Sequence, residues 1–549
     1  MKRLIVFLSV LLVIIILFNG ISLGVFAVEI DDDFCSCGYH FDDMPAVSEA
    51  NYIPSPEDEI LPSQVDLSED YSFPPVGDQK WVGSCVVWAT TYYQFGYQVA
   101  KMNNWDAKHD YSKCFSPRYI HNYLNIDENQ GTNHKDVYEV LKQIGAVRYD
   151  EFTPLTYPNG DGREYLEWYD DRDDMKEALR YRIDEYYKIE FADDEDMTPI
   201  TSPDSSELYL MKKRLSEGNI LSFEAPINSW KYDTLPQQTD SSLTGQYICY
   251  DCSESYNGHG MVIVGYNDDI WYDLDHDEVV DDFEKGAFKV ANSWGTGYKN
   301  NGFVWLLYDS INLESNYSGL NTPNRADSLE RYRTIMNNIY YYISVRECPL
   351  YLTADVTLNQ SKKCQTELKI GTSLISHTSP DILMKTFLNK WLGNSNYDGY
   401  ENNSFSERTF VFDLLYFPPN PNIRNNYYLD FIKSANGNGA EISSISINDK
   451  NDDVLASDSN YVFTSNETEK IYRYKIGLIG DVNDDGVVDG TDGQLIQMYR
   501  AHMISFSNEE EIVADVDRNG IINVIDSSYI NLCLYTNPEL LVGNYISLE

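Results

Sequence analysis

The sequence is poor in basic residues, in cysteine and in long apolar runs, and each shortage excludes a class of protein. Its 549 residues include 41 lysines and arginines against 87 aspartates and glutamates, a net charge of −46. Such a chain is not expected to bind the phosphate backbone of a nucleic acid, and it suits a protein that binds cations. Nine cysteines are too few for a disulfide scaffold. This length predicts about two to four domains.

The one long apolar run lies at the N-terminus. Two basic residues precede an almost unbroken aliphatic stretch over residues 4–18, and Val25 and Ala27 are small residues at the positions where signal peptidase cuts. We therefore expect residues 1–27 to be a signal peptide and the protein to be secreted, outside the cell or at its surface. A retained membrane anchor is the alternative, and no later stretch is apolar enough to span a bilayer.

Residues 28–62 are acidic and contain scattered prolines, which predicts an extended leader or short propeptide. Two cysteine pairs in the exported chain could form disulfides, Cys249 with Cys252 and Cys348 with Cys364, or all four could stay reduced. A zinc site is not expected, because no second Cys-x-x-Cys and no paired histidine motif accompanies them.

Cys85 stands where a Gly-Ser turn runs into a helix-forming stretch, residues 85–102. The positive end of a helix dipole and exposed backbone N–H groups favour a thiolate, which is the nucleophilic form of cysteine. The side-chain amide of Gln79 could reach back beside the thiol and form, with the backbone N–H of Cys85, a two-donor hole for an oxyanion. The alternative is a buried structural cysteine.

His259 begins an apolar strand, and Asn292 ends another. A thiol nucleophile needs a base within hydrogen-bonding reach and a third group that fixes the tautomer of that base. Asn292 would bind one imidazole nitrogen and leave the other for Cys85, and Trp294 would shield that bond from water. Taken singly, His259 could be a core histidine and Asn292 a turn residue.

These motifs resemble the papain family of cysteine peptidases, in the family's order, over about residues 60–320. The resemblance rests on Gln79…Gly83-Ser84-Cys85, Gly258-His259…Val264-Gly265-Tyr266 and Asn292-Ser-Trp294-Gly-Thr-Gly297. It implies a two-lobed α+β domain, residues 63–325, in which Cys85 attacks a peptide bond, His259 shuttles the proton, Asn292 orients it and Gln79 stabilises the oxyanion. The chain differs from the family at Val86, where tryptophan is usual, and at Gly258, where Asp or Asn is usual.

An acidic segment between His259 and Asn292 has the spacing of a calcium loop. EF-hand-type loops place oxygen ligands at positions 1, 3, 5, 7, 9 and 12. The residues at those positions are Asp273, Asp275, Asp277, Val279, Asp281 and Glu284. Glu278 occupies the sixth position, where glycine is expected, so an acidic solvated hairpin is the alternative.

The middle of the chain has short strand patterns separated by turns, which predicts an all-β sandwich over residues 335–472. The strand candidates are residues 340–345, 367–370, 409–413 and 442–447. No ligand site stands out in them. The region could bind carbohydrate or protein, or could buttress the preceding domain.

The C-terminal region contains a duplication with a calcium loop in each copy. The first loop places Asp481, Asn483, Asp485, Val487, Asp489 and Asp492 at the ligand positions, and the second places Asp515, Asp517, Asn519, Ile521, Asn523 and Asp526. Glycine stands at the sixth position of both loops. Helices are expected only after each loop, and an acidic tail without a fold is the alternative.

This duplication resembles a type I dockerin, a small α module with paired calcium loops, over residues 478–540. The resemblance implies two calcium ions, folding on calcium binding, and docking onto a cohesin module of a scaffold protein, as in the cellulosome of a fibre-degrading bacterium. The positions that usually contact cohesin carry Gly490, Thr491, Val524 and Ile525.

Together these patterns predict a secreted cysteine endopeptidase attached to a cohesin-bearing scaffold. Its partners would be protein or peptide substrates and the cohesin, with no nucleic acid and no stable membrane span after signal cleavage. A non-catalytic papain-like adhesion or structural subunit of the same scaffold is the main alternative. Transferase chemistry on the same Cys-His pair is a further one.

Overall fold

The structure is a computed structural model. It describes residues 47–48, 60–124, 131–154, 168–190, 202, 206–252, 258–312, 339–360, 365–373, 378–386, 388, 407–416, 426–433, 440–485, 487–535 and 544–548. The expected signal peptide and almost all of the expected leader lie outside these residues. No helix within the described ranges is both long and apolar enough to cross a membrane.

A central helical tract begins at the candidate nucleophile. Its three parts are α2 (Cys85–Val87), the π-helical η2 (Trp88–Phe95) and α3 (Gly96–Asn103), so the predicted continuous helix is confirmed. Every side chain of η2 is buried, which explains why the sequence there is apolar on all sides. The tract ends at Asn104, which adopts a left-handed φ of 55°.

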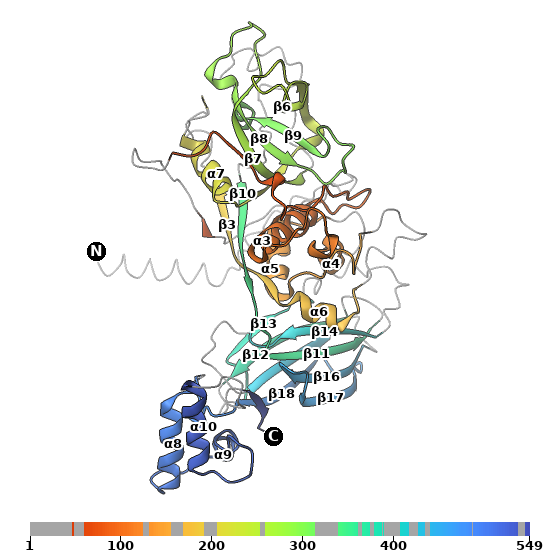
Figure 1. The fold of residues 1–549 in the computed structure, drawn as a ribbon. Helices are drawn as coiled ribbons and strands as arrows, with labels where there is room; N and C mark the ends of the chain where they lie inside the picture. The colour runs from red at the N-terminus through yellow and green to blue at the C-terminus, as the bar shows by residue number, and fades with distance from the viewer. Residues whose placement is uncertain are drawn as a thin grey trace, which may run out of the picture. The chain divides into compact units, whose positions relative to one another are not determined.

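Further helices follow along the chain, and α4 and α5 lie beside this tract (Figure 1). They are α4 (Pro117–Leu124), α5 (His134–Ile144), α6 (Arg172–Ala178) and α7 (Ser206–Ser216), with short 3-10 turns η1 (Leu67–Glu69), η3 (Tyr111–Lys113), η5 (Ile227–Ser229), η6 (Asp282–Glu284) and η7 (Tyr308–Ile311). The Asn133 side chain caps α5 by accepting from the backbone N–H of Asp136. Both α4 and α5 contact α2, so helices enclose one side of the Cys85 segment.

A ten-stranded sheet packs on the other side of the tract. Its strands are β1 (Val47–Ser48), β2 (Gln64–Asp66), β3 (Tyr181–Glu190), β4 (Leu221–Ala225), β5 (Trp230–Thr234), β6 (Tyr247–Cys252), β7 (His259–Trp271), β8 (Lys285–Ala291), β9 (Phe303–Leu307) and β10 (Ile339–Glu347). Their order is β1-β3-β10-β4-β7-β8-β9-β6-β5, and β2 pairs with β7. The antiparallel pair β7–β8 sets Val262 opposite Ala291. The start of β7 and the end of β8 therefore lie at the same edge region of the sheet.

The strand β10 corrects one prediction from the sequence. Residues 340–345 form a strand, as expected, but they do not belong to the β-rich middle region. They pair with β3 over nearly their whole length, and Tyr340 and Tyr341 pair with Phe223 and Ser222 of β4. The first sheet therefore includes a strand from beyond the expected domain boundary. The sequence did not predict this, because the local pattern of a strand does not encode its pairing partner.

The β-rich middle region is confirmed and consists of two antiparallel sheets. One has the order β14-β11-β16-β17 and the other the order β13-β12-β15-β18-β19. The strands are β11 (Leu352–Asn359), β12 (Thr366–Ser373), β13 (Ile382–Lys385), β14 (Arg408–Asp413), β15 (Asn426–Lys433), β16 (Glu441–Asp449), β17 (Val454–Val462), β18 (Glu469–Leu478) and β19 (Tyr545–Ser547). Apolar side chains of both sheets share one core, for example Val356 and Phe431.

That core also includes side chains of the helical region. Arg182 of β3 forms an ion pair of 2.5 Å with Asp413 of β14, and both side chains are almost fully buried. Arg172 of α6 pairs with Asp355 of β11 at 2.5 Å. Removing one member of a buried ion pair is strongly destabilising, so these contacts join the middle region firmly to the helices before it.

The C-terminal region contains three helices, α8 (Gly490–Arg500), α9 (Asn508–Ala514) and α10 (Val524–Tyr535). α8 and α10 follow the two acidic loops and pack against each other. The expectation that helices come only after the loops is wrong for the second loop, because α9 ends directly before Asp515. α9 starts with a capping box between Ser507 and Glu510. The predicted layout, an α+β domain, a β-rich region and a small helical module, is confirmed.

Candidate active site

Cys85 is the first residue of α2 and is fully buried. No side-chain hydrogen bond caps this helix at Ser84. The first backbone N–H groups of a helix have no partner within the helix and carry its positive partial charge. The thiol therefore lies at the helix end that favours its anionic form.

Gly260 brings the histidine strand against the cysteine helix. A Cβ atom added to Gly260 would lie 2.9 Å from the Cα of Val86 and 3.2 Å from the carbonyl carbon of Cys85. Only glycine fits this approach of two backbones. Because Gly260 follows His259 directly, the contact places two residues that are far apart in sequence, Cys85 and His259, at one junction.

His259 and Asn292 form the hydrogen bond that the sequence predicts. The distance from His259 Nε2 to Asn292 Oδ1 is 2.8 Å, and both residues are buried. An amide oxygen only accepts, so Nε2 carries the proton and Nδ1 is the basic nitrogen of this tautomer. Burial lowers the pKa of His259 to about 4, against the hydrogen bond that His259 donates to Asn292, which raises the pKa.

Trp294 and Tyr93 hold this pair from two sides. The rings of Trp294 and His259 lie 4.7 Å apart, centroid to centroid. The Tyr93 hydroxyl donates to the backbone oxygen of Asn292 at 2.9 Å and accepts from the backbone N–H of Gly77. These contacts fix the imidazole and restrict the access of water to its bond with Asn292.

Gln79 lies beside the same group, but its contacts add a residue that the sequence reading did not single out. The Ser293 hydroxyl donates to Gln79 Oε1 at 2.6 Å, and Gln79 Nε2 donates to the Val82 carbonyl at 3.0 Å. The backbone N–H of Ser293 donates to Asn292 Oδ1 at 2.7 Å. Ser293 thus links the amide of Gln79 to the oxygen that orients His259. The signal that could have identified Ser293 is its place as the second residue of the Asn-Ser-Trp-Gly motif.

The acidic insert has the same hydrogen-bond pattern as the two C-terminal loops. In each loop the residue at the fifth position donates its backbone N–H to the carboxylate at the first, and the residue at the ninth donates to the carboxylate at the twelfth. The bonds are Asp277 to Asp273 (3.2 Å) and Asp281 to Glu284 (2.9 Å), then Asp485 to Asp481 (3.3 Å) and Asp489 to Asp492 (2.8 Å), then Asn519 to Asp515 (3.1 Å) and Asn523 to Asp526 (2.7 Å).

Glycine at the sixth position is not required for this loop conformation. Glu278 adopts a φ of 66° where Gly520 adopts 81°, and left-handed φ is uncommon for a residue with a side chain. One carboxylate oxygen from each of Asp273, Asp275 and Asp277 lies within 4.8 Å of the others, as it does in the group of Asp515, Asp517 and Asp526. The donor sets consist of oxygen, as Ca²⁺ prefers.

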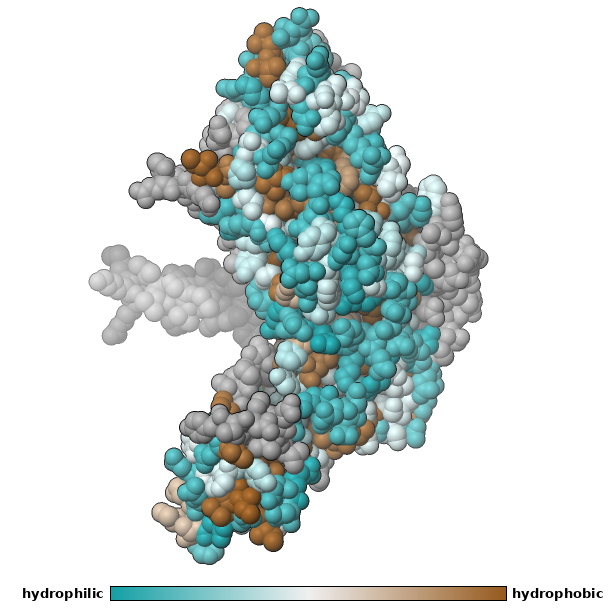
Figure 2. Space-filling model, viewed as in Figure 1, coloured by the Kyte–Doolittle hydropathy of each residue, from teal (hydrophilic) through white to brown (hydrophobic). Residues whose placement is uncertain are grey.

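The residues expected to contact cohesin lie at two helix starts. Gly490 and Thr491 begin α8, and Val524 and Ile525 begin α10. Val524 and Ile525 are 57% and 49% exposed. Figure 2 shows apolar side chains at the surface of this C-terminal part. Exposed apolar groups gathered on one face mark an interaction surface.

The two cysteine pairs do not form disulfides where the structure describes them. Cys249 and Cys252 are buried and not joined to each other, so the disulfide considered for them is absent. Cys348 is also a free buried thiol, and Cys364 lies outside the described residues.

Comparison with known proteins identifies the C-terminal region. Residues 479–532 match the family of the dockerin type I domain, which confirms the resemblance seen in the sequence. Dockerins of this type bind calcium, and the module implies a cohesin partner and anchoring to a scaffold. A search of curated proteins found no match.

The solved structures that resemble this chain are papain-like cysteine proteases. Xylellain, a cysteine protease from Xylella fastidiosa, is 18% identical with a TM-score of 0.37 and covers 57% of this chain and 98% of its own. Procathepsin L 3 from Tenebrio molitor is 15% identical with a TM-score of 0.32 and covers 55% and 75%. ProCathepsin B from Trypanosoma congolense is 12% identical with a TM-score of 0.35 and covers 57% and 87%. Likeness at this level carries no conclusion about activity.

Proposed function

We propose that this chain is a secreted cysteine endopeptidase that its dockerin anchors to a cohesin-bearing scaffold. The observation that carries the peptidase assignment is the His259–Asn292 hydrogen bond at the junction where Gly260 contacts the Cys85 helix. A buried thiol at a helix start, a histidine of fixed tautomer and an amide that fixes it are the parts of a nucleophilic site.

In this mechanism His259 Nδ1 takes the proton of the Cys85 thiol, and Cys85 Sγ attacks the carbonyl carbon of the scissile peptide bond. The backbone N–H of Cys85 and the Gln79 amide stabilise the oxyanion that forms. His259 then gives a proton from Nδ1 to the leaving amine, which departs and leaves a thioester. A water molecule, deprotonated by the same nitrogen, attacks the thioester and releases the acid, so the thiol and the imidazole return to their starting states.

The geometry of Gln79 supports its role as an oxyanion donor. Its side-chain oxygen is held by Ser293, so the amide N–H groups point away from that serine. One of them donates to Val82, and the second is the group that the oxyanion would use. Ser293 acts in this proposal as a positioning residue, because it sets the orientation of the Gln79 amide without touching the substrate.

We also propose that calcium binds to all three acidic loops. Two ions would lie in the dockerin, held by the ligand positions of its loops, which carry Asp481, Asn483, Asp485, Val487, Asp489, Asp492, Asp515, Asp517, Asn519, Ile521, Asn523 and Asp526. A third would lie in the insert, held by Asp273, Asp275, Asp277, Val279, Asp281 and Glu284. The shared hydrogen-bond pattern and the oxygen donor sets support this proposal. The bound ion would neutralise the carboxylates and hold the insert next to β8, which leads to Asn292.

The proposed route out of the cell rests on the sequence. Residues 1–27 would be removed as a signal peptide, and residues 28–62 would remain as a leader before the peptidase. Gly490, Thr491, Val524 and Ile525 would contact the cohesin, since they lie at the starts of α8 and α10 with Val524 and Ile525 exposed.

Covalent labelling of the active site tests the peptidase assignment. The protein without its signal peptide would be treated with an epoxide inhibitor of thiol proteases, in calcium and reductant, beside a Cys85→Ala control. We expect one adduct by intact mass on the wild type and none on the control. A folded, calcium-loaded protein that stays unlabelled after trimming of the leader would instead support a non-catalytic subunit.

Counting bound calcium by native mass spectrometry tests the third ion. We expect three ions on the wild type and two on an Asp275→Ala, Asp277→Ala variant. A matched pair of changes in the dockerin, Asp517→Ala and Asn519→Ala, should also remove one ion. A wild-type protein that holds two ions, both lost with changes in the dockerin, would show that the insert is a solvated acidic hairpin.

A further inference from the structure

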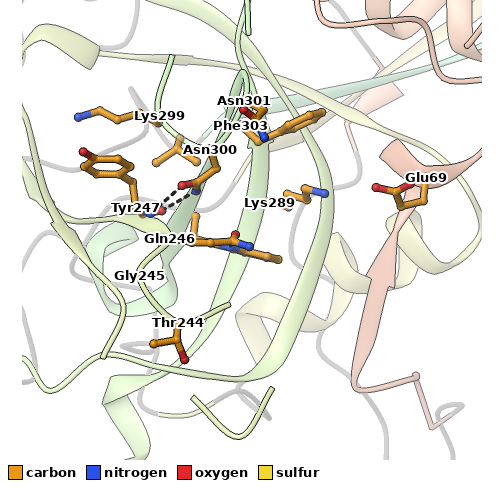
Figure 3. A pocket seen from close by; sticks show the side chains of 12 residues that line it. Glu69, Thr244, Gly245, Gln246, Tyr247, Lys289, Lys299, Asn300, Asn301 and Phe303 are labelled. Carbon is orange, nitrogen blue, oxygen red and sulfur yellow. Dashed lines mark hydrogen bonds between the residues drawn. The ribbon is translucent and has the colours of Figure 1, made fainter. Parts of the chain in front are cut away.

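A pocket of about 570 Å³ opens on the β part of the first domain, away from the residues of the proposed mechanism (Figure 3). Its walls come from η1, β8, β9 and the turns that precede β6 and β9. Gln79, Cys85, His259 and Asn292 are not among its lining residues. The volume lies within the range of about 300 to 1,000 Å³ that small-molecule and side-chain sites occupy.

Hydrogen bonds between its walls hold the pocket in shape. The Asn300 side chain accepts from the backbone N–H of Tyr247 at 2.7 Å and donates to the carbonyl of Tyr247 at 3.0 Å (Figure 3). The indole N–H of Trp305 donates to Gln246 Oε1 at 2.7 Å. Because these contacts join protein groups to one another, they preorganise the pocket, and binding would cost little conformational entropy.

The charges at one end of the pocket are compensated within the protein. The Lys289 ammonium lies 2.7 Å from Asp66 Oδ2 and 2.9 Å from the Ser68 hydroxyl. The Glu69 carboxylate pairs with Lys108 at 3.0 Å. A ligand at this end would have to compete with existing ion pairs.

Lys299, at the other end, has no such partner. Its Nζ lies 3.6 Å from the ring centroid of Tyr232 and 4.7 Å from that of Tyr247. Across the described part of the chain, no carboxylate lies within ion-pairing distance of it. Cation–π contacts stabilise the ammonium but do not neutralise it, so among the described residues Lys299 brings a positive charge that no carboxylate pairs, in a protein with a net charge of −46.

The turn that presents Lys299 is built at a conformational cost. Lys299 and Asn301 have φ values of 38° and 56°, in the region that side-chain-bearing residues rarely adopt. Asn301 and Tyr247 both line the pocket, and both are exposed. The ammonium therefore lies over the Tyr247 ring at one end of the pocket (Figure 3).

We propose that this pocket is a secondary binding site for an acidic segment of a polypeptide, which places one Asp or Glu carboxylate against Lys299. A single ammonium matches a singly charged carboxylate, whereas a phosphate dianion would need more cationic donors. Tyr247 and Asn301 provide the aromatic and amide contacts that protein interfaces favour. If the proposed peptidase function holds, the site selects acidic substrates at a distance from the bond that is cleaved.

The test uses the full chain with Cys85→Ala, so that binding is measured without cleavage. A fluorescently labelled peptide rich in glutamate and tyrosine would be titrated and its anisotropy followed. We expect Lys299→Met to weaken binding by about tenfold, the effect of losing a close interfacial charge pair, and Lys299→Arg to retain most of the affinity. Lys285→Met is the control, since this half-exposed lysine pairs with Asp282 and does not line the pocket.

A second peptide, with every glutamate replaced by glutamine, should bind the wild type about tenfold more weakly. The proposal is overturned if the two peptides bind equally, or if Lys299→Met binds as the wild type does. It is also overturned if only an oligosaccharide of uronic acids binds at Lys299. Epoxide labelling of Cys85 in the Lys299→Met protein separates the two proposals, because loss of the secondary site leaves that labelling intact.

Discussion

Two buried histidines in the first domain differ in their hydrogen-bond partners and in the roles that we assign to them. His134 binds Glu224 Oε1 through Nδ1 at 3.1 Å and Ser222 Oγ through Nε2 at 2.7 Å. His259 binds Asn292 through Nε2. Burial lowers the pKa of both, to about 3 for His134 and about 4 for His259. Burial and a lowered pKa therefore do not distinguish a structural histidine from a catalytic one.

The two histidines differ in what their second ring nitrogen contacts. In His134 it accepts from the Ser222 hydroxyl, so the serine, histidine and carboxylate have the connectivity of a hydrolytic triad. All three are buried, and Tyr341 stacks on the imidazole at 4.5 Å. No substrate can reach this group, which ties α5 to β4 and β10. In His259 the hydrogen bond to Asn292 leaves Nδ1 as a base at the start of the Cys85 helix.

The largest expected effect comes from removing the imidazole of His259, the base in the proposed function. His259→Gln should lower kcat/KM by about 10⁶, as the loss of the histidine of a triad does, with the melting temperature nearly unchanged. Peptide hydrolysis and differential scanning calorimetry measure the two quantities. His109→Gln, at an exposed histidine paired with Asp106, is the control and should retain full activity. Full activity of His259→Gln would remove the contrast between the two histidines.

Removing the sealed imidazole should act on stability instead. His134→Ala leaves Glu224 and Ser222 buried without their partner, and we expect the free energy of unfolding to fall by about 3 kcal/mol. Urea denaturation followed by tryptophan fluorescence measures this change. Hydrolysis at a temperature where the variant is folded should stay within about twofold of the wild type. A stable but inactive His134→Ala protein would contradict the structural assignment.

Asn292→Ala should have an intermediate effect on activity. The imidazole keeps its contact with Trp294 but loses the bond that fixes its tautomer, and we expect kcat/KM to fall by about a hundredfold. Ser293→Ala should cost less, because it loosens Gln79 without touching His259. The ranking of the two variants, measured on one peptide substrate, checks this order. A greater loss in Ser293→Ala than in Asn292→Ala would contradict it.

The smallest effect concerns pH. An unfolded histidine titrates near 6.5, whereas His134 and His259 titrate lower when folded. Below about pH 6.5 the unfolded chain therefore binds more protons, and stability falls as pH falls toward the folded pKa values. For His134 alone this amounts to about 2 kcal/mol between about pH 7 and about pH 5. Urea midpoints at both pH values should show a smaller difference in His134→Gln than in the wild type; an equal difference would contradict this origin.

The two histidines also show what the sequence can predict. His259 lies in a motif, Gly-His-Gly before an apolar strand, and its chemistry required a cysteine at a helix start and an asparagine at a strand end. The structure places those residues together. His134 has no such signal, because its partners Ser222 and Glu224 lie about ninety residues away on a strand whose pairing the local pattern does not encode.

The acidic loops and β10 show the same contrast between a feature that local sequence predicts and one that it does not. Ligand spacing within twelve consecutive residues predicts a loop, since the contacts are local, and the insert does adopt the same hydrogen-bond pattern as the dockerin loops. The strand at residues 340–345 was also predictable as a strand. Its place between β3 and β4 was not, because it depends on contacts with residues more than a hundred positions earlier.

The placement of β10 has a consequence for synthesis of the chain. β3 and β4 emerge from the ribosome well before the strand that separates them in the sheet, and Tyr341 of that strand covers His134. Until residue 347 has been made, the sheet that carries His259 lacks the strand between β3 and β4. His134 and its polar partners then stay open to water on the side that Tyr341 covers. The nascent N-terminal part therefore lacks one strand of its sheet. The first domain therefore completes its sheet only after the chain has grown beyond residue 325, the expected end of that domain.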